Sequence, residues 1–439
     1  MKACATLLAA AALGGVACAA EFGGLRLTPV GGYRVPVYSS FHRPHEAGAS
    51  RSTGYTNGSI AVHTFEDGRT VFWHENGKIG KQFLESHTVA EMGSMDGDPA
   101  KWPLLTEASS PDRVWTQHEL YGDRGPRGYH SPGGILFDPA VERLWFGTDI
   151  WYHTKSDPEQ WLAVVDYNSG EVLPVTPSVP LPMHKFSGGF GLIPEGFATE
   201  HLDGKRFAFI AGGYSSGQGA AIGPTLAAMS LEPQENPEAV VLLDHLATAE
   251  VGGVPFSEGK RYVPEAFADY TTDMNWYYPV HEGVGYWTGT IKGNGCWLKI
   301  DGFEGVLYLA AYGAGEQKYR AQTEGWGAPV KNVLYIYDAE AFVDVARLKR
   351  WPLGCPREYY EFYRFDEAEK GINRIGRSIT IDQGTGLLWV CYPQVWKPNQ
   401  SATERFPVVI AYRASAVSAA ERESEDKPAR PDVSPGVTE

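Results

Sequence analysis

Two histidines, His130 and His153, lie near the ends of two short apolar runs in the stretch YHSPGGILFDPAVERLWFGTDIWYHT, residues 129–154. A neutral imidazole is a general base near neutral pH, and a second histidine or a tyrosine such as Tyr152 is a matching acid. The two runs predict a β-hairpin centred near residue 141, which places the two histidines across from one another. The stretch therefore indicates a candidate acid–base pair.

Arginines would complete this chemistry on an anionic sugar. Arg374 and Arg377 precede a similar pair of apolar runs near the C-terminus. A guanidinium pairs with the carboxylate of a uronate, and the acid–base pair would then carry out β-elimination, as in a polysaccharide lyase. The predicted catalytic residues are His130, His153, Tyr152, Arg374 and Arg377.

A degenerate repeat reveals the elements that must position these residues. An apolar residue and an Asp are followed, after five residues, by Leu, an aromatic and an apolar residue. The copies are ILFDPAVERLWF (135–146), LKIDGFEGVLYL (298–309) and ITIDQGTGLLWV (379–390), and looser copies lie at 58–73 and 189–213. Another apolar run ending in Tyr follows each of the three clear copies. Repeated up-and-down sheets of three or four strands are typical of a β-propeller.

The predicted fold is therefore all-β, a single-domain β-propeller of five to seven blades. Six blades are favoured, because five units are legible and a sixth could lie between residues 245 and 285. We expect the propeller to span residues 21–413.

Three aspartates recur at the same place in the repeat. Asp138, Asp301 and Asp382 each stand where the first strand turns into the second. An aspartate at such a turn accepts hydrogen bonds from the turn backbone. Three similar turns are better explained by architecture than by catalysis, so these carboxylates are predicted to be structural.

The register of the repeat also collects residues on one face of the propeller. The loop that leads into the first strand and the loop that follows the second lie on the same side, where propellers usually bind ligands. The predicted substrate-binding residues of this face are Tyr55, Asn57, His74, His184, Lys185, Tyr214, Lys292, Asn294, Tyr392 and Trp396. Aromatic rings stack on sugars and the polar groups take hydroxyls and acidic substituents, so the mixture suits a polysaccharide or oligosaccharide.

Other chemistries lack their motifs. A glycoside hydrolase needs two facing carboxylates, and the sequence pairs none. There is no Gly-rich nucleotide loop after a strand, no GxSxG and no HExxH. The sequence therefore predicts neither a cofactor nor a metal.

Composition and the chain ends bear on location and partners. Asp and Glu outnumber Lys and Arg by 53 to 38, a net charge of −15 that disfavours nucleic acid. Residues 1–20 resemble a signal peptide, which predicts export to the periplasm or beyond, with a lipoprotein anchored at Cys18 as a minor alternative. No later segment is apolar for long enough to span a membrane. Residues 414–439 are polar and charged and are predicted to form a disordered tail. The oligomeric state is not indicated.

Several further stretches resemble an uncharacterised family of exported bacterial β-propeller-like proteins. They are SGGFG (187–191), AGGYSSG with GPTLAA (211–228), GVGYWTGT (283–290) and VLYIYDAEAF (333–342). The resemblance runs from about residue 130 to 392 and implies an exported propeller. The family has no established activity, so it implies no substrate.

Three classes of function remain open from the sequence. The first is a carbohydrate-active enzyme, a lyase in its most specific form. The second is a glycan-binding propeller with the same face and no acid–base pair. The third is a protein-interaction scaffold at the cell envelope.

Overall fold

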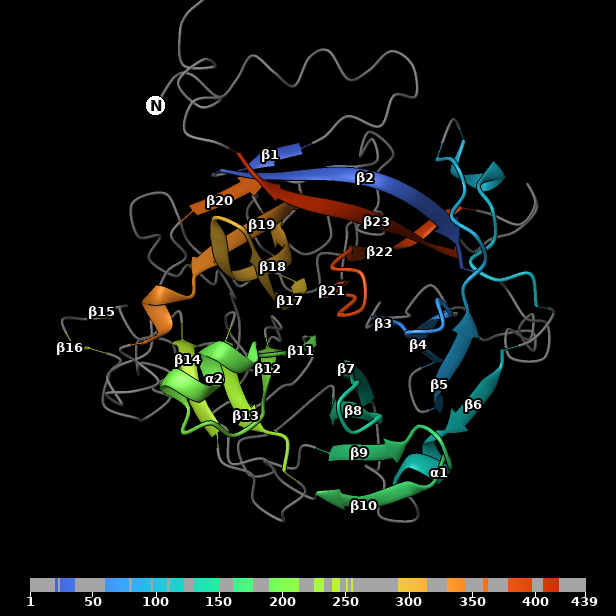
Figure 1. Ribbon diagram of the computed structural model, residues 1–439, viewed down its shortest axis with the longest axis horizontal. Coiled ribbons are helices and arrows are strands. Elements are labelled where there is room, and N and C mark those ends of the chain that lie inside the picture. Colours follow the sequence, from blue (N-terminus) through green and yellow to red (C-terminus); the bar gives the residue numbers. More distant parts are fainter. Residues whose placement is uncertain are drawn as a thin grey trace, which may run out of the picture.

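The apolar runs of the repeat form antiparallel strands in a computed structural model of the chain (Figure 1). The structure describes residues 20–22, 24–35, 60–78, 81–95, 98–108, 111–121, 130–150, 161–176, 189–212, 225–232, 239–244, 250–251, 254–255, 291–313, 330–343, 358–361, 378–396 and 406–417. The predicted signal peptide lies outside these residues except for Ala20. The predicted tail lies outside them after Val417.

Five blades surround a central axis in the described part of the chain. Blade 1 contains β3 (Ile60–Thr64), β4 (Thr70–Lys78), β5 (Lys81–Thr88) and β6 (Arg113–Thr116). Blade 2 contains β7 (His130–Asp138), β8 (Arg143–Ile150), β9 (Trp161–Asp166) and β10 (Val172–Thr176). Blade 3 contains β11 (Phe190–Leu192), β12 (Phe207–Gly212), β13 (Thr225–Ser230) and β14 (Ala239–Asp244).

The remaining two blades complete the ring. Blade 4 contains β17 (Ile291–Ile300), β18 (Phe303–Gly313), β19 (Val330–Asp338) and β20 (Glu358–Glu361). Blade 5 contains β21 (Ser378–Ile381), β22 (Leu388–Trp396), β23 (Phe406–Ala416), β2 (Leu25–Arg34) and β1 (Ala20–Phe22). The all-β propeller predicted from the repeat is therefore confirmed, and its clear copies are β7–β8, β17–β18 and β21–β22.

The blade count is five, within the predicted range of five to seven, and not the favoured six. The innermost strands contact one another in a closed circle, β3 to β7, β7 to β11, β11 to β17, β17 to β21 and β21 to β3. Because β11 contacts β17 directly, the ring has no place for a blade between blades 3 and 4. Of residues 245–285, the structure describes only the short pair β15 (Glu250–Val251) and β16 (Val254–Pro255).

The two ends of the described chain close the ring together. In blade 5, β2 from the N-terminal part pairs with β23 from the C-terminal part, from Leu25 opposite Ala416 to Arg34 opposite Val408. The Arg34 side chain donates to the backbone oxygen of Trp102, 2.5 Å away, beside the 3₁₀-helix η3 (Pro99–Lys101). This blade therefore exists only when both ends of the propeller are present.

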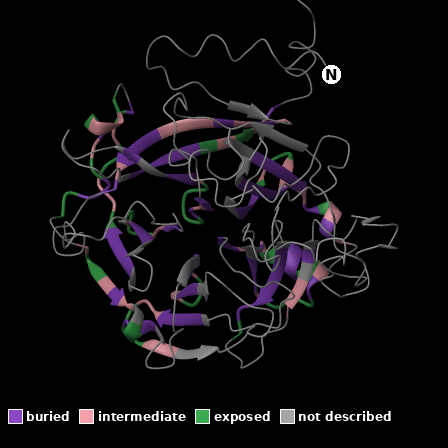
Figure 2. Ribbon diagram, turned by 180° about the vertical axis from the view of Figure 1, so that it is seen from behind, coloured by how far each residue is buried: buried purple, intermediate pink, exposed green. Residues whose placement is uncertain are grey.

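The core consists of layers between adjacent blades, because both faces of each sheet are covered (Figure 2). Successive residues of one strand enter different layers. In β22, Leu388 and Val390 pack towards blade 4, whereas Trp389 and Cys391 pack towards blade 1. Two buried faces explain why the strands read as continuous apolar runs and not as alternating ones.

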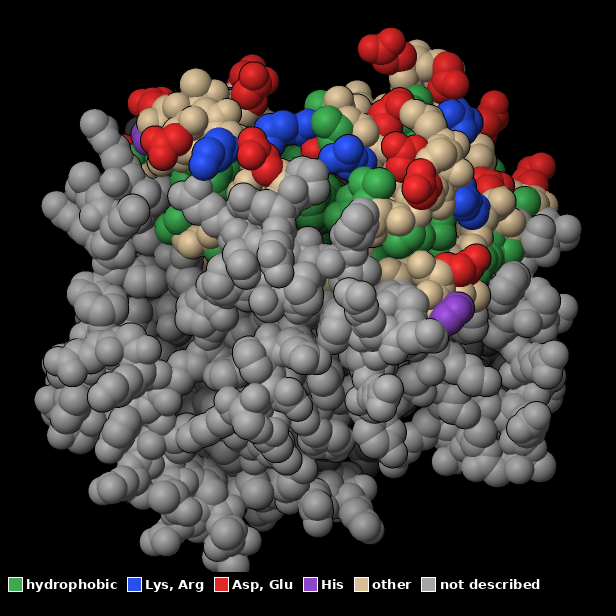
Figure 3. Space-filling model, turned by 90° about the horizontal axis from the view of Figure 1, so that it is seen from below, with side chains coloured by type: hydrophobic (Ala, Val, Ile, Leu, Met, Phe, Trp, Pro, Cys, Tyr) green, Lys and Arg blue, Asp and Glu red, His purple; other side chains and the backbone are tan. Residues whose placement is uncertain are grey.

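Few helices accompany the sheets in the described residues. They include α1 (Gln117–Tyr121) and α2 (Glu195–His201), and residues 340–343 are also helical. No helix in the described part of the chain is long and apolar enough to cross a membrane. Viewed from below, the described side chains gather along one side of the molecule, where acidic and basic groups are interspersed with hydrophobic ones (Figure 3).

Two of the three turn aspartates, Asp138 and Asp382, have the structural role predicted from their repetition, most clearly Asp382 in blade 5. The Asp382 carboxylate accepts from the Gly384 N–H at 2.9 Å within its own turn. It also accepts from the backbone N–H of Thr64 at 2.8 Å and from its hydroxyl at 2.6 Å, which links blade 5 to blade 1. A Cβ on Gly384 would lie 2.0 Å from the Thr64 oxygen, so the contact requires glycine there.

The other two aspartates differ from each other. Asp138 accepts from the Ala140 N–H at 3.2 Å and pairs with Arg206, which links blade 2 to blade 3. Asp301 stands in the corresponding turn of blade 4 and is exposed. The repeated aspartate therefore joins neighbouring blades at two of its three positions.

Candidate functional site

All five innermost strands run in the same direction, which defines two faces of the ring. At their beginnings, the Ser378 hydroxyl of β21 accepts from the Ile60 N–H of β3 at 3.3 Å. At their ends, Asp382 binds Thr64, and the Phe65 ring lies 5.6 Å from the Phe137 ring. We call the side where these strands begin the strand-start face, and the opposite side the turn face.

The strand-start face is where the sequence places its candidate residues. The first strand begins and the second strand ends there in each blade, at Ile60 and Lys78, His130 and Ile150, Phe190 and Gly212, Ile291 and Gly313, and Ser378 and Trp396. The sequence neighbours of these strand ends include the predicted catalytic and substrate-binding residues.

The described residues include few of these side chains. Tyr55, Asn57, Tyr152, His153, His184, Lys185, Tyr214, Arg374 and Arg377 lie outside the described residues. For His130, Lys292, Asn294 and Trp396 the strand backbone is described and the side chain is not. The roles assigned to these residues stay predictions.

The hairpin of blade 2 has the predicted register. Asp138 pairs with Arg143 and Ile135 with Phe146, so the hairpin is centred between residues 140 and 141. The backbone of His130 pairs with Ile150, three residues before His153 in the chain. The backbone therefore has the register from which the His130–His153 pair was predicted.

Tyr392 lies in the core. Its side chain is fully buried in the layer between blades 4 and 5, and its hydroxyl lies 3.2 Å from the hydroxyl of Tyr412. One of these hydroxyls donates to the other. This placement gives Tyr392 a packing role, and its predicted role in substrate binding is untested.

His74 lies inside a strand and not in the loop expected after it. Pairing between β4 and β5 continues from Val71 opposite Thr88 to Lys78 opposite Lys81, so β4 extends past His74. The backbone of His74 pairs with Ile60 on one side and with Glu85 on the other. Residues paired across antiparallel strands have side chains on the same face of the sheet, so His74 and Glu85 meet.

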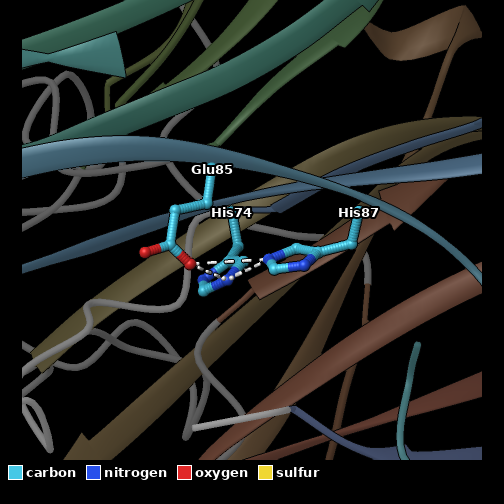
Figure 4. A group of neighbouring side chains, drawn as sticks. All are labelled: His74, Glu85 and His87. Carbon is cyan, nitrogen blue, oxygen red and sulfur yellow. Dashed lines mark hydrogen bonds and ion pairs between the residues drawn. The ribbon is translucent and has the colours of Figure 1, made fainter. Parts of the chain in front are cut away.

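The His74 side chain belongs to a buried cluster with Glu85 and His87 (Figure 4). The Nε2 atoms of the two histidines are 3.0 Å apart. Glu85 Oε2 lies 3.2 Å from His74 Nε2 and 3.5 Å from His87 Nε2. His74 is 5% exposed, and Glu85 and His87 are fully buried.

Burial bears on the protonation of His87. It lowers the pKa of His87, because desolvation outweighs the hydrogen bond and the charge of Glu85, which act in the opposite direction, and the nearby His74 lowers the pKa further. A neutral imidazole is a hydrogen-bonding group and a metal ligand. In the described part of the chain, this is the group of His, Cys, Asp and Glu side chains whose donor atoms all lie within 4.8 Å of one another.

Sequence reasoning missed Glu85 and His87. They stand two residues apart in FLESHT, which places both on one face of a strand. The signal that could have found them is the pairing of this Glu-x-His with His74 across the hairpin of β4 and β5. The repeat pattern predicts that the second strand ends near residue 73, so it does not reveal this pairing.

Comparisons with known proteins identify no sequence family. No protein-family model matches the chain, and no curated protein sequence matches it. Matching solved structures include the GH93 α-L-arabinofuranosidase of Fusarium graminearum in complex with arabinobiose, at 9% identity and a TM-score of 0.32. A mutant of that organism's arabinofuranosidase with an iminosugar inhibitor matches at 8% identity and a TM-score of 0.32. Each match covers 80% of this chain and 73% of the other. The suspected family of exported propellers is not identified by sequence.

Proposed function

We propose that the protein is exported and binds or acts on carbohydrate at the strand-start face. The proposal is supported by the common direction of the innermost strands, which directs ten strand ends to one side of the ring. The residues that flank these ends combine aromatic rings with amides, lysines and arginines. Such surfaces hold sugars by stacking and by hydrogen bonds to hydroxyl groups.

The most specific form of the proposal is a polysaccharide lyase that acts on a uronate. His130 or His153 removes the proton next to the carboxylate, and the other histidine or Tyr152 protonates the leaving oxygen. Arg374 and Arg377 pair with the carboxylate and stabilise the negative charge that develops on it. The single observation that carries this form is the pairing of the His130 backbone with Ile150, which precedes His153 by three residues in the chain.

The test compares His130→Ala and His153→Ala with the wild-type protein on anionic and neutral polysaccharides. Ultraviolet absorbance reports the unsaturated uronate formed by elimination, and a reducing-sugar assay reports cleavage of any kind. His118→Ala is the matched control, because His118 is an exposed histidine of α1, which contacts the outer strands of blades 1 and 2. We expect each test substitution to lower elimination by roughly 100-fold or more, with the control unchanged.

Each outcome has a definite meaning. Elimination that survives both substitutions contradicts the assigned base. Reducing ends without elimination keep carbohydrate as the substrate and replace the lyase by a hydrolase. Retention on a polysaccharide gel without cleavage supports a glycan-binding propeller. If the protein neither cleaves nor is retained by any polysaccharide, the proposal is contradicted, and a protein partner is left as the alternative.

A further inference from the structure

The cluster of His74, Glu85 and His87 lies in the layer between blades 1 and 5. On the same face of blade 1 lies Phe72, whose ring centroid is 5.8 Å from that of His74. Phe72 in turn lies 6.3 Å from Trp389 of blade 5. The three polar side chains are therefore placed at the edge of an apolar layer, on the strands β4 and β5 of a single blade.

The surroundings of the cluster suit a bound metal ion. Glu85 and His87 are fully buried, and His74 is 5% exposed. A metal ion held among such side chains compensates the cost of removing a carboxylate from water.

Three donor atoms converge in the cluster. The two Nε2 atoms are 3.0 Å apart, and Glu85 Oε2 lies 3.2 Å from one and 3.5 Å from the other. Each of these atoms offers a lone pair when it carries no proton. A divalent cation accepts all three lone pairs at once and balances the carboxylate.

The spacing of the donor atoms fits such a cation. Bonds of about 2.0–2.1 Å at tetrahedral angles separate neighbouring ligand atoms by about 3.3 Å. The three separations here are 3.0, 3.2 and 3.5 Å, on either side of that value. Two imidazoles with one carboxylate form a donor set for zinc and related transition metals, whereas calcium and magnesium prefer oxygen ligands.

We propose that His74, Glu85 and His87 bind one divalent transition-metal ion of the zinc type and thereby clip β4 to β5 at the layer between blades 1 and 5. The ion is held by side chains of one blade and stabilises the sheet face against which the closing blade packs. This site is independent of the proposed carbohydrate function, so either proposal can fail without the other.

The primary test measures zinc binding by the purified protein. Bound ions are removed with a chelator, the protein is titrated with Zn²⁺ alone, and the metal retained after gel filtration is quantified. We expect one zinc ion per chain and a rise in Tm on zinc addition. Glu85→Gln keeps the shape of the side chain and removes its charge, so we expect it to weaken binding by more than about 10-fold.

His63→Gln is the matched control. His63 is a histidine of blade 1 whose Nδ1 lies 3.9 Å from a carboxylate oxygen of Asp382, outside the cluster. It should bind one zinc ion as the wild type does. A wild type that retains no stoichiometric metal, or a Glu85→Gln variant that retains as much as the wild type, would overturn the proposal.

A second variant keeps the test decisive where Glu85→Gln fails to fold. His74→Cys introduces a thiolate ligand, and Co²⁺ bound beside it gives a sulfur-to-cobalt charge-transfer band in the near ultraviolet. We expect this band in His74→Cys and not in the wild type. Cobalt binding without the band would place the ion elsewhere and overturn the assignment.

Discussion

The two faces of β4 show how one blade meets two different neighbours. On one face, the Trp73 ring lies 4.8 Å from the Phe137 ring of blade 2 and nearly parallel to it. On the other face, the same strand presents Phe72 to blade 5 and, two residues later, His74 to Glu85 and His87. The layer towards blade 2 is stabilised by aromatic packing, whereas the layer towards blade 5 contains a buried cluster of polar side chains. Because successive side chains of a strand point to opposite faces, β4 packs Trp73 against blade 2 and contributes His74 to the polar cluster on its other face.

The largest effect should come from Trp73, because it fills the layer between blades 1 and 2. We expect Trp73→Ala to lower the free energy of unfolding by about 3–5 kcal/mol, measured by guanidinium denaturation. Trp73→Phe is the control and should cost much less, since Trp73 Nε1 has no hydrogen-bond partner among the described residues. Equal losses in the two variants would contradict the importance of ring packing there.

Removing the proposed metal should have the next largest effect and should act on the opposite layer. A free ion at 100 times its Kd stabilises the folded state by about 2.7 kcal/mol. We therefore expect a chelator to lower the Tm of the wild type and of Trp73→Phe, and to leave that of Glu85→Gln unchanged. If the chelator still lowers the Tm of Glu85→Gln, the stabilising metal binds outside this cluster.

Asp382→Asn should have a smaller effect on the same layer, at its edge on the turn face. The asparagine oxygen can replace only part of the bonds that the carboxylate accepts from Thr64, Gly384 and Thr385. We expect a loss of about 1–3 kcal/mol in the free energy of unfolding. Asp301→Asn, the exposed equivalent in blade 4, should change it by less than about 0.5 kcal/mol. Similar losses at the two positions would show that bonds within the turn, and not the link between blades, account for the change in the free energy of unfolding.

The smallest effect concerns His63, which faces blade 2. Burial lowers its pKa from 6.5, against the opposing charges of Asp382 and Glu142. Because the folded pKa is depressed, the unfolded chain binds more protons below about pH 6.5, so stability is lost as the pH falls through that value. We expect His63→Gln to flatten this acid-side decline in urea denaturation midpoints. If His63→Gln loses stability with falling pH as the wild type does, titratable groups other than His63 cause the decline.

The sequence predicts the ring better than the site. The Asp-to-aromatic pattern recurs because each blade needs the same turn and the same layered packing, so three copies were enough to identify a propeller. The count of six failed because spacing along the chain does not show which inner strands touch, and β11 contacts β17 directly. A long insertion between two blades therefore looked like space for another.

The candidate site was harder to predict because it depends on pairing across strands. The register of the blade 2 hairpin could be read from its two apolar runs, and the pairing of His130 with Ile150 agrees with it. In blade 1 the polar residues of β4 resembled a loop, although its pairing with β5 continues to Lys78. Glu85 and His87 become partners of His74 only once that pairing is known.

The pairing of β2 with β23 fixes the order in which the chain can assemble. During synthesis β1 and β2 emerge before the other strands, yet β23, the partner of β2, emerges last, about as far along the chain as the propeller allows. Blades 1 to 4 contain consecutive strands and can form as they appear, while the edge of β2 that pairs with β23 stays open and invites association with other chains. The entropy of closing so long a loop grows only with the logarithm of its length. Ring closure is therefore the late step at which a truncated C-terminus would leave the propeller open.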